Sequence, residues 1–103
     1  MNEEQTDKEQ QLQKAVNDIL QSLINAEKTK GVDIWVGENV NGYEFELYFS
    51  LKLSYKPDIE LIYENGKATI VGTWNGKKYS VEVPYEITDE LYDIIEEKYL
   101  EGI

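Results

Sequence analysis

Residues 64–78 read ENGKATIVGTWNGKK, a short apolar segment with an Asn-Gly pair at each end. Asn-Gly is the preferred sequence for a two-residue turn between antiparallel strands, because both turn residues must adopt positive φ. Two such turns fix the register of three strands. The cross-strand pairs that follow all lie on one apolar face: Leu61 with Ile70, Tyr63 with Ala68, Ile70 with Val81, and Ala68 with Val83.

A third Asn-Gly pair, at residues 41–42, lies between two further segments of alternating polarity. The same rule predicts a hairpin here, with Val40 facing Tyr43, Val36 facing Leu47 and Ile34 facing Phe49. The connection over residues 56–58 carries no Asn-Gly. A three-residue loop there keeps Leu53 opposite Leu61, whereas a two-residue loop would place Leu53 opposite Glu60.

The sequence therefore predicts a five-stranded antiparallel meander with strands at about 32–40, 43–55, 59–64, 67–74 and 77–83. The second strand is unusually long, since thirteen extended residues span about 43 Å at ~3.3 Å each. We expect it to coil or to bulge, so that the sheet is strongly curled around the helices.

Sequence features typical of helices lie before the first predicted strand and after the last one. Thr6 and Glu9 form a capping box, apolar residues recur from Leu12 to Ala26 at helical spacing, and Gly31 suits the position just past the helix. Thr88 suits the start of a second helix. The predicted class is α+β in the order α-β-β-β-β-β-α, with the N-terminal and C-terminal helices packed on one face. We expect residues 1–103 to form a single domain and residues 1–5 to be a frayed tail.

The charge composition excludes several functions. The chain has 21 acidic residues against 10 lysines, a net charge of −11, and neither arginine, histidine nor cysteine. Direct nucleic-acid or anionic-membrane binding is disfavoured because both require clustered basic residues. No His-assisted or Cys-assisted nucleophile and no ordinary zinc site is available. We therefore expect no enzyme activity, no cofactor and no metal, and, since the N-terminus carries no secretory signal, a cytoplasmic location.

The predicted first hairpin suggests a contact surface on the outer face of the sheet. Its register places Trp35 opposite Tyr48, with Asp33, Glu44 and Glu46 around them. An aromatic anchor surrounded by acidic groups is typical of a surface that binds a basic partner. The alternative is a cross-strand aromatic pair that only stabilises the hairpin. Because glutamate is disfavoured in strands, Glu44 and Glu46 are expected to matter more for binding than the acids of the C-terminal helix.

A second acidic surface is predicted in residues 81–102, where eight acidic residues accompany one lysine. Such a run is usually the solvated face of a surface helix. It could also occupy the nucleic-acid channel of another protein, as a nucleic-acid mimic. The helix residues concerned are Asp89, Glu90, Asp93, Glu96, Glu97 and Glu101.

Three functional hypotheses follow. The first is a small, acidic, non-enzymatic protein that binds a basic surface on a partner and inhibits or neutralises it, for example a nucleic-acid enzyme or a toxin countered by an immunity protein. The second is a module that binds a small molecule or a peptide in a hollow between the curled sheet and the helices, with Tyr43, Tyr55, Tyr63 and Tyr79 on its wall. The third is a homodimeric structural subunit.

Overall fold

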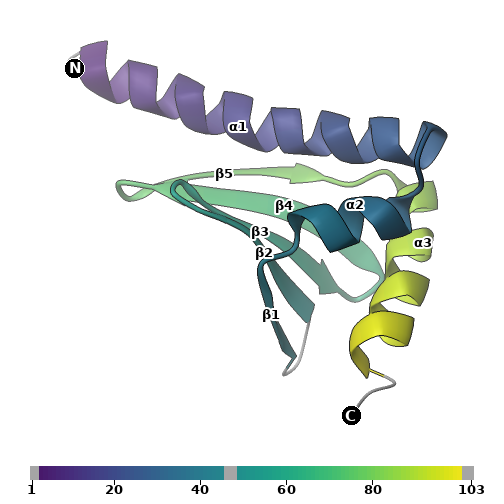
Figure 1. The fold of residues 1–103 in the computed structure, drawn as a ribbon. Coiled ribbons are helices and arrows are strands. Elements are labelled where there is room, and N and C mark those ends of the chain that lie inside the picture. The colour runs from purple at the N-terminus through teal and green to yellow at the C-terminus, as the bar shows by residue number, and fades with distance from the viewer. Residues whose placement is uncertain (1–2, 46–48, 101–103) are drawn as a thin grey trace.

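The computed structural model describes residues 3–45 and 49–100. Within those residues it contains three α-helices and one five-stranded antiparallel sheet, which confirms the predicted α+β class (Figure 1). The chain runs in the order α1 (Glu3–Lys28), α2 (Val32–Asn39), β1 (Gly42–Phe45), β2 (Phe49–Tyr55), β3 (Asp58–Glu64), β4 (Lys67–Trp74), β5 (Lys77–Glu82), α3 (Tyr85–Ile95) and the π-helical segment η1 (Glu96–Leu100).

Two of the three Asn-Gly pairs form the predicted hairpin turns. Asn65 and Gly66 have φ of 54° and 77°, and Asn75 and Gly76 have φ of 53° and 79°. These are the positive values that a two-residue turn between twisted strands requires. The predicted register is confirmed across both turns, with Leu61 paired to Ile70 and Ile70 paired to Val81.

The prediction of a strand at residues 32–40 is wrong, because this segment forms helix α2. The apolar residues of this segment fit both the two-residue period of a strand and the 3.6-residue period of a helix. Alternation would bury Ile34 and expose Trp35, whereas helical spacing buries Val32, Trp35 and Val36 together. The structure has the helical arrangement: Trp35 is 1% exposed and Ile34 is 47% exposed. Helix α2 packs against α1 and α3, so tertiary contacts decide between the two periods.

The Asn41-Gly42 pair consequently leads into a strand and does not turn. The Asn41 backbone N–H donates to the carbonyl oxygen of Lys52 at 2.7 Å. The long strand predicted at 43–55 is divided into β1 and β2, which pair with each other from Gly42 opposite Lys52 to Phe45 opposite Phe49.

The connection between β2 and β3 also differs from the prediction. Tyr55 pairs with Asp58, so the loop has two residues and not three. The register shifts between Lys52 and Ser54, which pair with Glu60 and Ile59, and this irregularity at Leu53 absorbs one residue. Leu53 therefore stays buried despite the shorter loop. The sheet is open, in the order β1-β2-β3-β4-β5, and the predicted strong curl is not confirmed.

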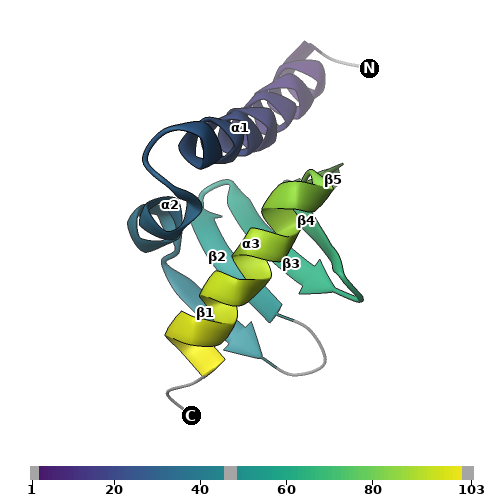
Figure 2. The same ribbon diagram turned by 90° about the vertical axis from the view of Figure 1, so that its right-hand side faces the viewer.

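The core lies on the face of the sheet that the helices cover (Figure 2). Helix α1 packs on β4 and β5, and it approaches β4 most closely at Gly72. A Cβ atom at that position would lie 2.6 Å from Val16 Cγ2 and 2.8 Å from Leu12 Cδ1. Gly72 therefore permits the close packing of α1 on β4.

The helix ends differ in detail from the predictions. Helix α1 begins at Glu3, inside the segment expected to be a frayed tail. Helix α3 begins at Tyr85 after Pro84, three residues before the predicted cap. Thr88 is buried in the first turn, where its hydroxyl donates to the carbonyl oxygen of Pro84 at 3.1 Å. Among the described residues, no helix is long and apolar enough to cross a membrane.

Candidate partner-binding surface

Trp35 does not lie on an exposed sheet face, and the prediction that placed it there is wrong. Its ring is buried in the core, and its Nε1–H donates to Ser22 Oγ at 2.9 Å. That hydrogen bond satisfies the one polar group of the indole. A side chain in this position cannot contact a partner while the protein is folded.

The other residues of the predicted contact surface are not brought together with Trp35. Asp33 is exposed on α2, where its backbone carbonyl accepts a hydrogen bond from Lys98 Nζ at 3.3 Å. Glu44 lies on the edge strand β1, opposite Ser50, and its side chain is outside what the structure describes. Glu46 and Tyr48 lie outside the described residues. The surface predicted on the first hairpin therefore gives no site that can be built from this structure.

The second predicted acidic surface does form one face of α3 and η1. The helix buries Ile87, Thr88, Leu91 and Ile95 on one side. The opposite side carries six exposed carboxylates, which we call the acidic face: Glu86, Asp89, Glu90, Asp93, Glu96 and Glu97. Glu101, the last residue predicted for this surface, lies outside the described residues.

The carboxylates of the acidic face take part in no ion pair within the part of the chain that the structure describes. The lysines that form ion pairs use acids elsewhere: Lys14 with Asp18, Lys30 with Glu38, Lys52 with Asp58 and Glu60, and Lys77 with Glu9. Lys98, beside the acidic face in sequence, instead contacts the backbone of α2. Within the described residues, no ion pair therefore offsets the negative charge that this face presents to solvent.

Three aromatic rings from three elements lie together beside the acidic face. We call Phe49 of β2, Tyr63 of β3 and Tyr92 of α3 the aromatic cluster. The ring centroids are 5.7 Å apart for Phe49 and Tyr63, 5.3 Å for Tyr63 and Tyr92, and 6.2 Å for Phe49 and Tyr92. These distances are typical of favourable aromatic contacts. Figure 2 shows how α3 crosses the strands to bring the three elements together.

The cluster is only partly covered. Phe49 and Tyr63 are half-buried, and Tyr92 is 36% exposed. Tyr85 precedes Tyr92 by seven residues, about two turns of helix, and is 71% exposed. The two tyrosines therefore lie on the same side of α3, with Asp89 between them.

The electrostatics of Tyr63 reflect these neighbours. Burial raises the pKa of its hydroxyl above the usual tyrosine value, and the negative charges of ionised Tyr92, of Asp89 and of ionised Tyr85 raise this pKa further. Tyr63 is therefore neutral at physiological pH and keeps a hydroxyl proton to donate. The effect of Asp89 and Tyr85 also places both groups within electrostatic range of the cluster.

The tyrosines expected on the wall of an internal hollow do not converge. Tyr55, at the end of β2 far from Tyr63, is exposed beneath the Lys52 ammonium, which lies 5.2 Å from its ring centroid. The hydroxyl of Tyr79 accepts a hydrogen bond from Asn17 Nδ2 at 3.3 Å, as part of the packing of α1 on β5. Tyr43 is half exposed on the edge strand β1.

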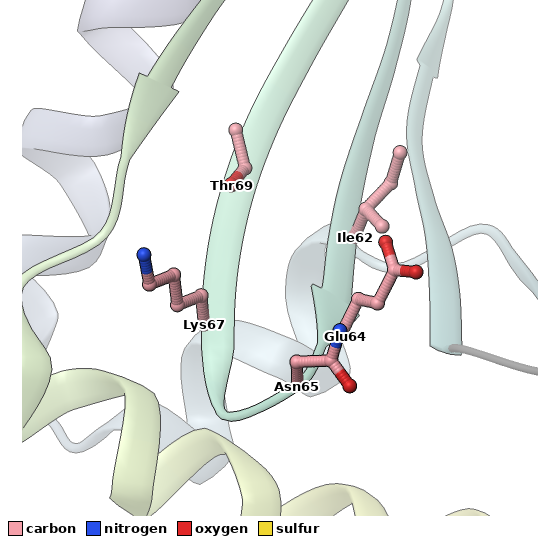
Figure 3. Close-up of a pocket in the computed structure, with 5 residues that line it drawn as sticks. All are labelled: Ile62, Glu64, Asn65, Lys67 and Thr69. Atoms are coloured by element: carbon pink, nitrogen blue, oxygen red, sulfur yellow. The ribbon is translucent and has the colours of Figure 1, made fainter.

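Two shallow hollows flank the turn between β3 and β4. One has a volume of about 320 Å³ and is lined by Ile62, Glu64, Asn65, Lys67 and Thr69. Figure 3 shows that Lys67 points away from Glu64 and Ile62, so the charged groups do not converge on one centre. The other, about 520 Å³, lies between this turn and the start of α3 and includes Tyr85. Among the described residues, no group of three or more acidic side chains is arranged to hold a metal ion.

Comparison of the chain with protein-family models, with curated proteins and with solved structures gives no match. Function is therefore argued from the surface alone.

Sequence reasoning identified the acidic face but missed the aromatic cluster beside it. Tyr85 and Tyr92 recur at helical spacing outside the buried stripe of α3, and this pattern could have indicated an aromatic edge to the acidic face. Nothing in the sequence could pair them with Phe49 and Tyr63, because these contacts depend on where α3 crosses the sheet.

Proposed function

We propose that this chain is a non-enzymatic interaction protein whose α3 surface binds a basic surface on a partner protein and thereby inhibits or neutralises it. The observation that carries the proposal is the acidic face, six exposed carboxylates without an ion-pair partner among the described residues, beside partly exposed aromatic rings. Aromatic residues surrounded by charge are typical of residues that dominate binding energy at interfaces.

The spacing of charge on this face supports a partner that binds nucleic acid. From Glu86 to Glu97 the chain advances eleven residues, which is about 17 Å of helix axis at ~1.5 Å per residue. Six carboxylates over that length give about one charge every 3 Å, close to the ~3.4 Å per charge of one strand of DNA. A groove that attracts a phosphate backbone would be attracted to this helix by the same electrostatic potential.

The experiment measures binding of a lysine decapeptide to the wild-type protein and to two variants with equal changes in charge. Glu90→Gln with Asp93→Asn alters the acidic face. Glu27→Gln with Glu64→Gln is the matched control, since both residues are exposed and unpaired among the described residues. We expect the acidic-face variant to bind the peptide about two- to tenfold more weakly, the effect of losing two exposed ion pairs with the peptide. The affinity of the control variant should change much less.

Salt dependence gives a second measurement on the same samples. Binding should weaken strongly between about 0.1 M and 1 M salt, where the screening length falls from ~10 Å to ~3 Å. If the acidic-face variant and the control variant lose equal affinity for the lysine peptide, bulk charge alone attracts the peptide and the proposal is rejected.

The two other hypotheses receive less support. A ligand hollow between helices and sheet is opposed by the close contact of α1 with β4 at Gly72. A homodimer would be revealed by a molecular mass that doubles with concentration and by loss of peptide binding as the dimer forms. We favour partner binding because a dimer joined through the outer sheet face or an edge strand would leave the acidic face without a role, whereas a basic partner is complementary to it.

A further inference from the structure

Two tyrosines of α3, Tyr92 in the aromatic cluster and Tyr85 two turns before it, have surface that the fold leaves exposed. Tyr85 is 71% exposed and Tyr92 is 36% exposed, so neither ring is needed in full for the core. Both lie within range of Asp89, which follows Tyr85 by four residues and precedes Tyr92 by three. Side chains at these spacings are neighbours on a helix, with Cβ atoms about 5–6 Å apart. One ligand group could therefore contact a ring face and a carboxylate together.

Guanidinium is the group that fits this combination. It is planar, stacks on aromatic faces, and donates paired hydrogen bonds to a carboxylate. A lysine ammonium can pair with the carboxylate and lie over a ring, but it has no flat surface to stack and does not form the paired hydrogen bonds of guanidinium. The chain itself contains no arginine, so no side chain of its own can supply a guanidinium to these rings.

At the opposite end of β2, a tyrosine ring of this protein already contacts a cation. The Lys52 ammonium lies 5.2 Å from the centroid of the Tyr55 ring, within the ~6 Å range of a cation–π contact. Beside the aromatic cluster, the negative charge of the acidic face would add to this attraction, because the carboxylates and the π faces both favour a cation.

We propose that Tyr85, Tyr92 and Asp89 form a binding site for an arginine side chain of the partner, so that α3 prefers arginine-bearing basic segments to lysine-bearing ones. This inference rests on the proposed function and names the partner chemistry at the same surface. The acidic face provides attraction to any basic segment, and the rings provide the discrimination between the two basic side chains.

The test compares two decapeptides of equal length and charge, one alternating arginine with glycine and the other alternating lysine with glycine. Binding is measured by isothermal titration at one salt concentration. We expect the arginine peptide to bind the wild-type protein about two- to fivefold more tightly, because guanidinium stacks on the rings and donates paired hydrogen bonds, whereas ammonium supplies only the charge and cation–π attraction.

The variants remove the rings one at a time. Tyr85→Leu and Tyr92→Leu should each weaken binding of the arginine peptide more than binding of the lysine peptide and so reduce the arginine preference, since the stacking contribution is lost. Tyr92→Phe keeps the ring and should keep the preference. Tyr55→Leu, at the far end of β2, is the matched control and should change neither affinity. Because Tyr85 is mostly exposed, its replacement is informative even if Tyr92→Leu fails to fold.

The outcomes separate this inference from the function on which it rests. Binding of both peptides with equal affinity, or an arginine preference that survives both leucine variants, would overturn the arginine site and leave the acidic face as the binding surface. Failure of both peptides to bind would overturn the proposed function and the arginine site together.

Discussion

Gly72→Ala is expected to destabilise the protein, although alanine usually stabilises a position with ordinary backbone angles. The new Cβ would lie 2.6 Å from Val16 Cγ2 and 2.8 Å from Leu12 Cδ1. Carbon atoms pack best at about 3.5–4.0 Å, so each contact is too close by roughly 1 Å. Val16 is 0% exposed and Leu12 is 1% exposed, so neither side chain can move into solvent.

The magnitude follows from two opposing effects. Overpacking a filled core costs about 1–3 kcal/mol. The lower entropy of the unfolded alanine chain offsets about 0.4–1 kcal/mol of this cost. The free energy of unfolding should therefore fall by about 1–2 kcal/mol. With a urea dependence of ~1–3 kcal/mol per molar, the midpoint of unfolding should move down by about 0.3–2 M.

Urea unfolding followed by circular dichroism measures this change. Gly37→Ala is the control, because its new Cβ meets only Lys98 Nζ, at an ordinary 3.5 Å. Residue 37 lies inside α2, where alanine should stabilise the protein by about 0.5–1 kcal/mol. The double variant Gly72→Ala with Val16→Ala should lose less free energy of unfolding than the two single variants lose in sum. Removing Val16 Cγ2 relieves the overlap with the new Cβ atom at residue 72. A midpoint for Gly72→Ala at or above that of the wild type would refute the close packing of α1 on β4.

Three further changes test the core and the titrating groups. Trp35→Ala should lower the free energy of unfolding by about 3–5 kcal/mol, measured by thermal unfolding, because a fully buried aromatic ring is lost. The hydrogen bond with Asp58 raises the pKa of Lys52, so the stability that Lys52 contributes is complete below the unfolded pKa of ~10.4 and is lost as pH rises through the folded value. As pH rises into strong alkali, the free energy of unfolding should therefore fall less in Lys52→Met than in the wild type. Tyr63→Phe should remove a late step from the tyrosinate absorbance titration, since burial raises the pKa of Tyr63.

Each of these changes has its own control. Ile34→Ala, next to Trp35 but 47% exposed, should cost far less; a larger loss there than at Trp35 would favour the strand arrangement that the structure excludes. Asp58→Asn should reproduce part of the Lys52→Met effect in alkali, and identical alkaline curves for wild type and Lys52→Met would contradict the pKa direction. Loss of absorbance from the main step of the titration in Tyr63→Phe, with the late step unchanged, would contradict the raised pKa of Tyr63.

How much of the candidate surface the sequence could predict depends on how far apart its residues lie along the chain. The acidic face belongs to one helix, so the local alternation of charged and apolar residues in residues 85–97 was enough to predict it. The aromatic cluster joins residue 49 to residue 92. No local period relates two such positions, and only the path of α3 across the sheet brings the rings together. The anchor predicted at Trp35 failed for the same reason, since its environment is set by α1 and α3.

The sequence by itself determined the β3-β4-β5 part of the sheet. At Asn65-Gly66 and Asn75-Gly76 the turn needs positive φ at both residues, and the flanking apolar pattern admits one register, so local chemistry and burial agree. The tertiary structure alone decided residues 32–45. There the apolar positions satisfy a helix and a strand equally well, and Asn41-Gly42 can turn or extend. The helix prevails because it places Val32, Trp35 and Val36 together in the core, and burying that large apolar area outweighs the local preference for a turn.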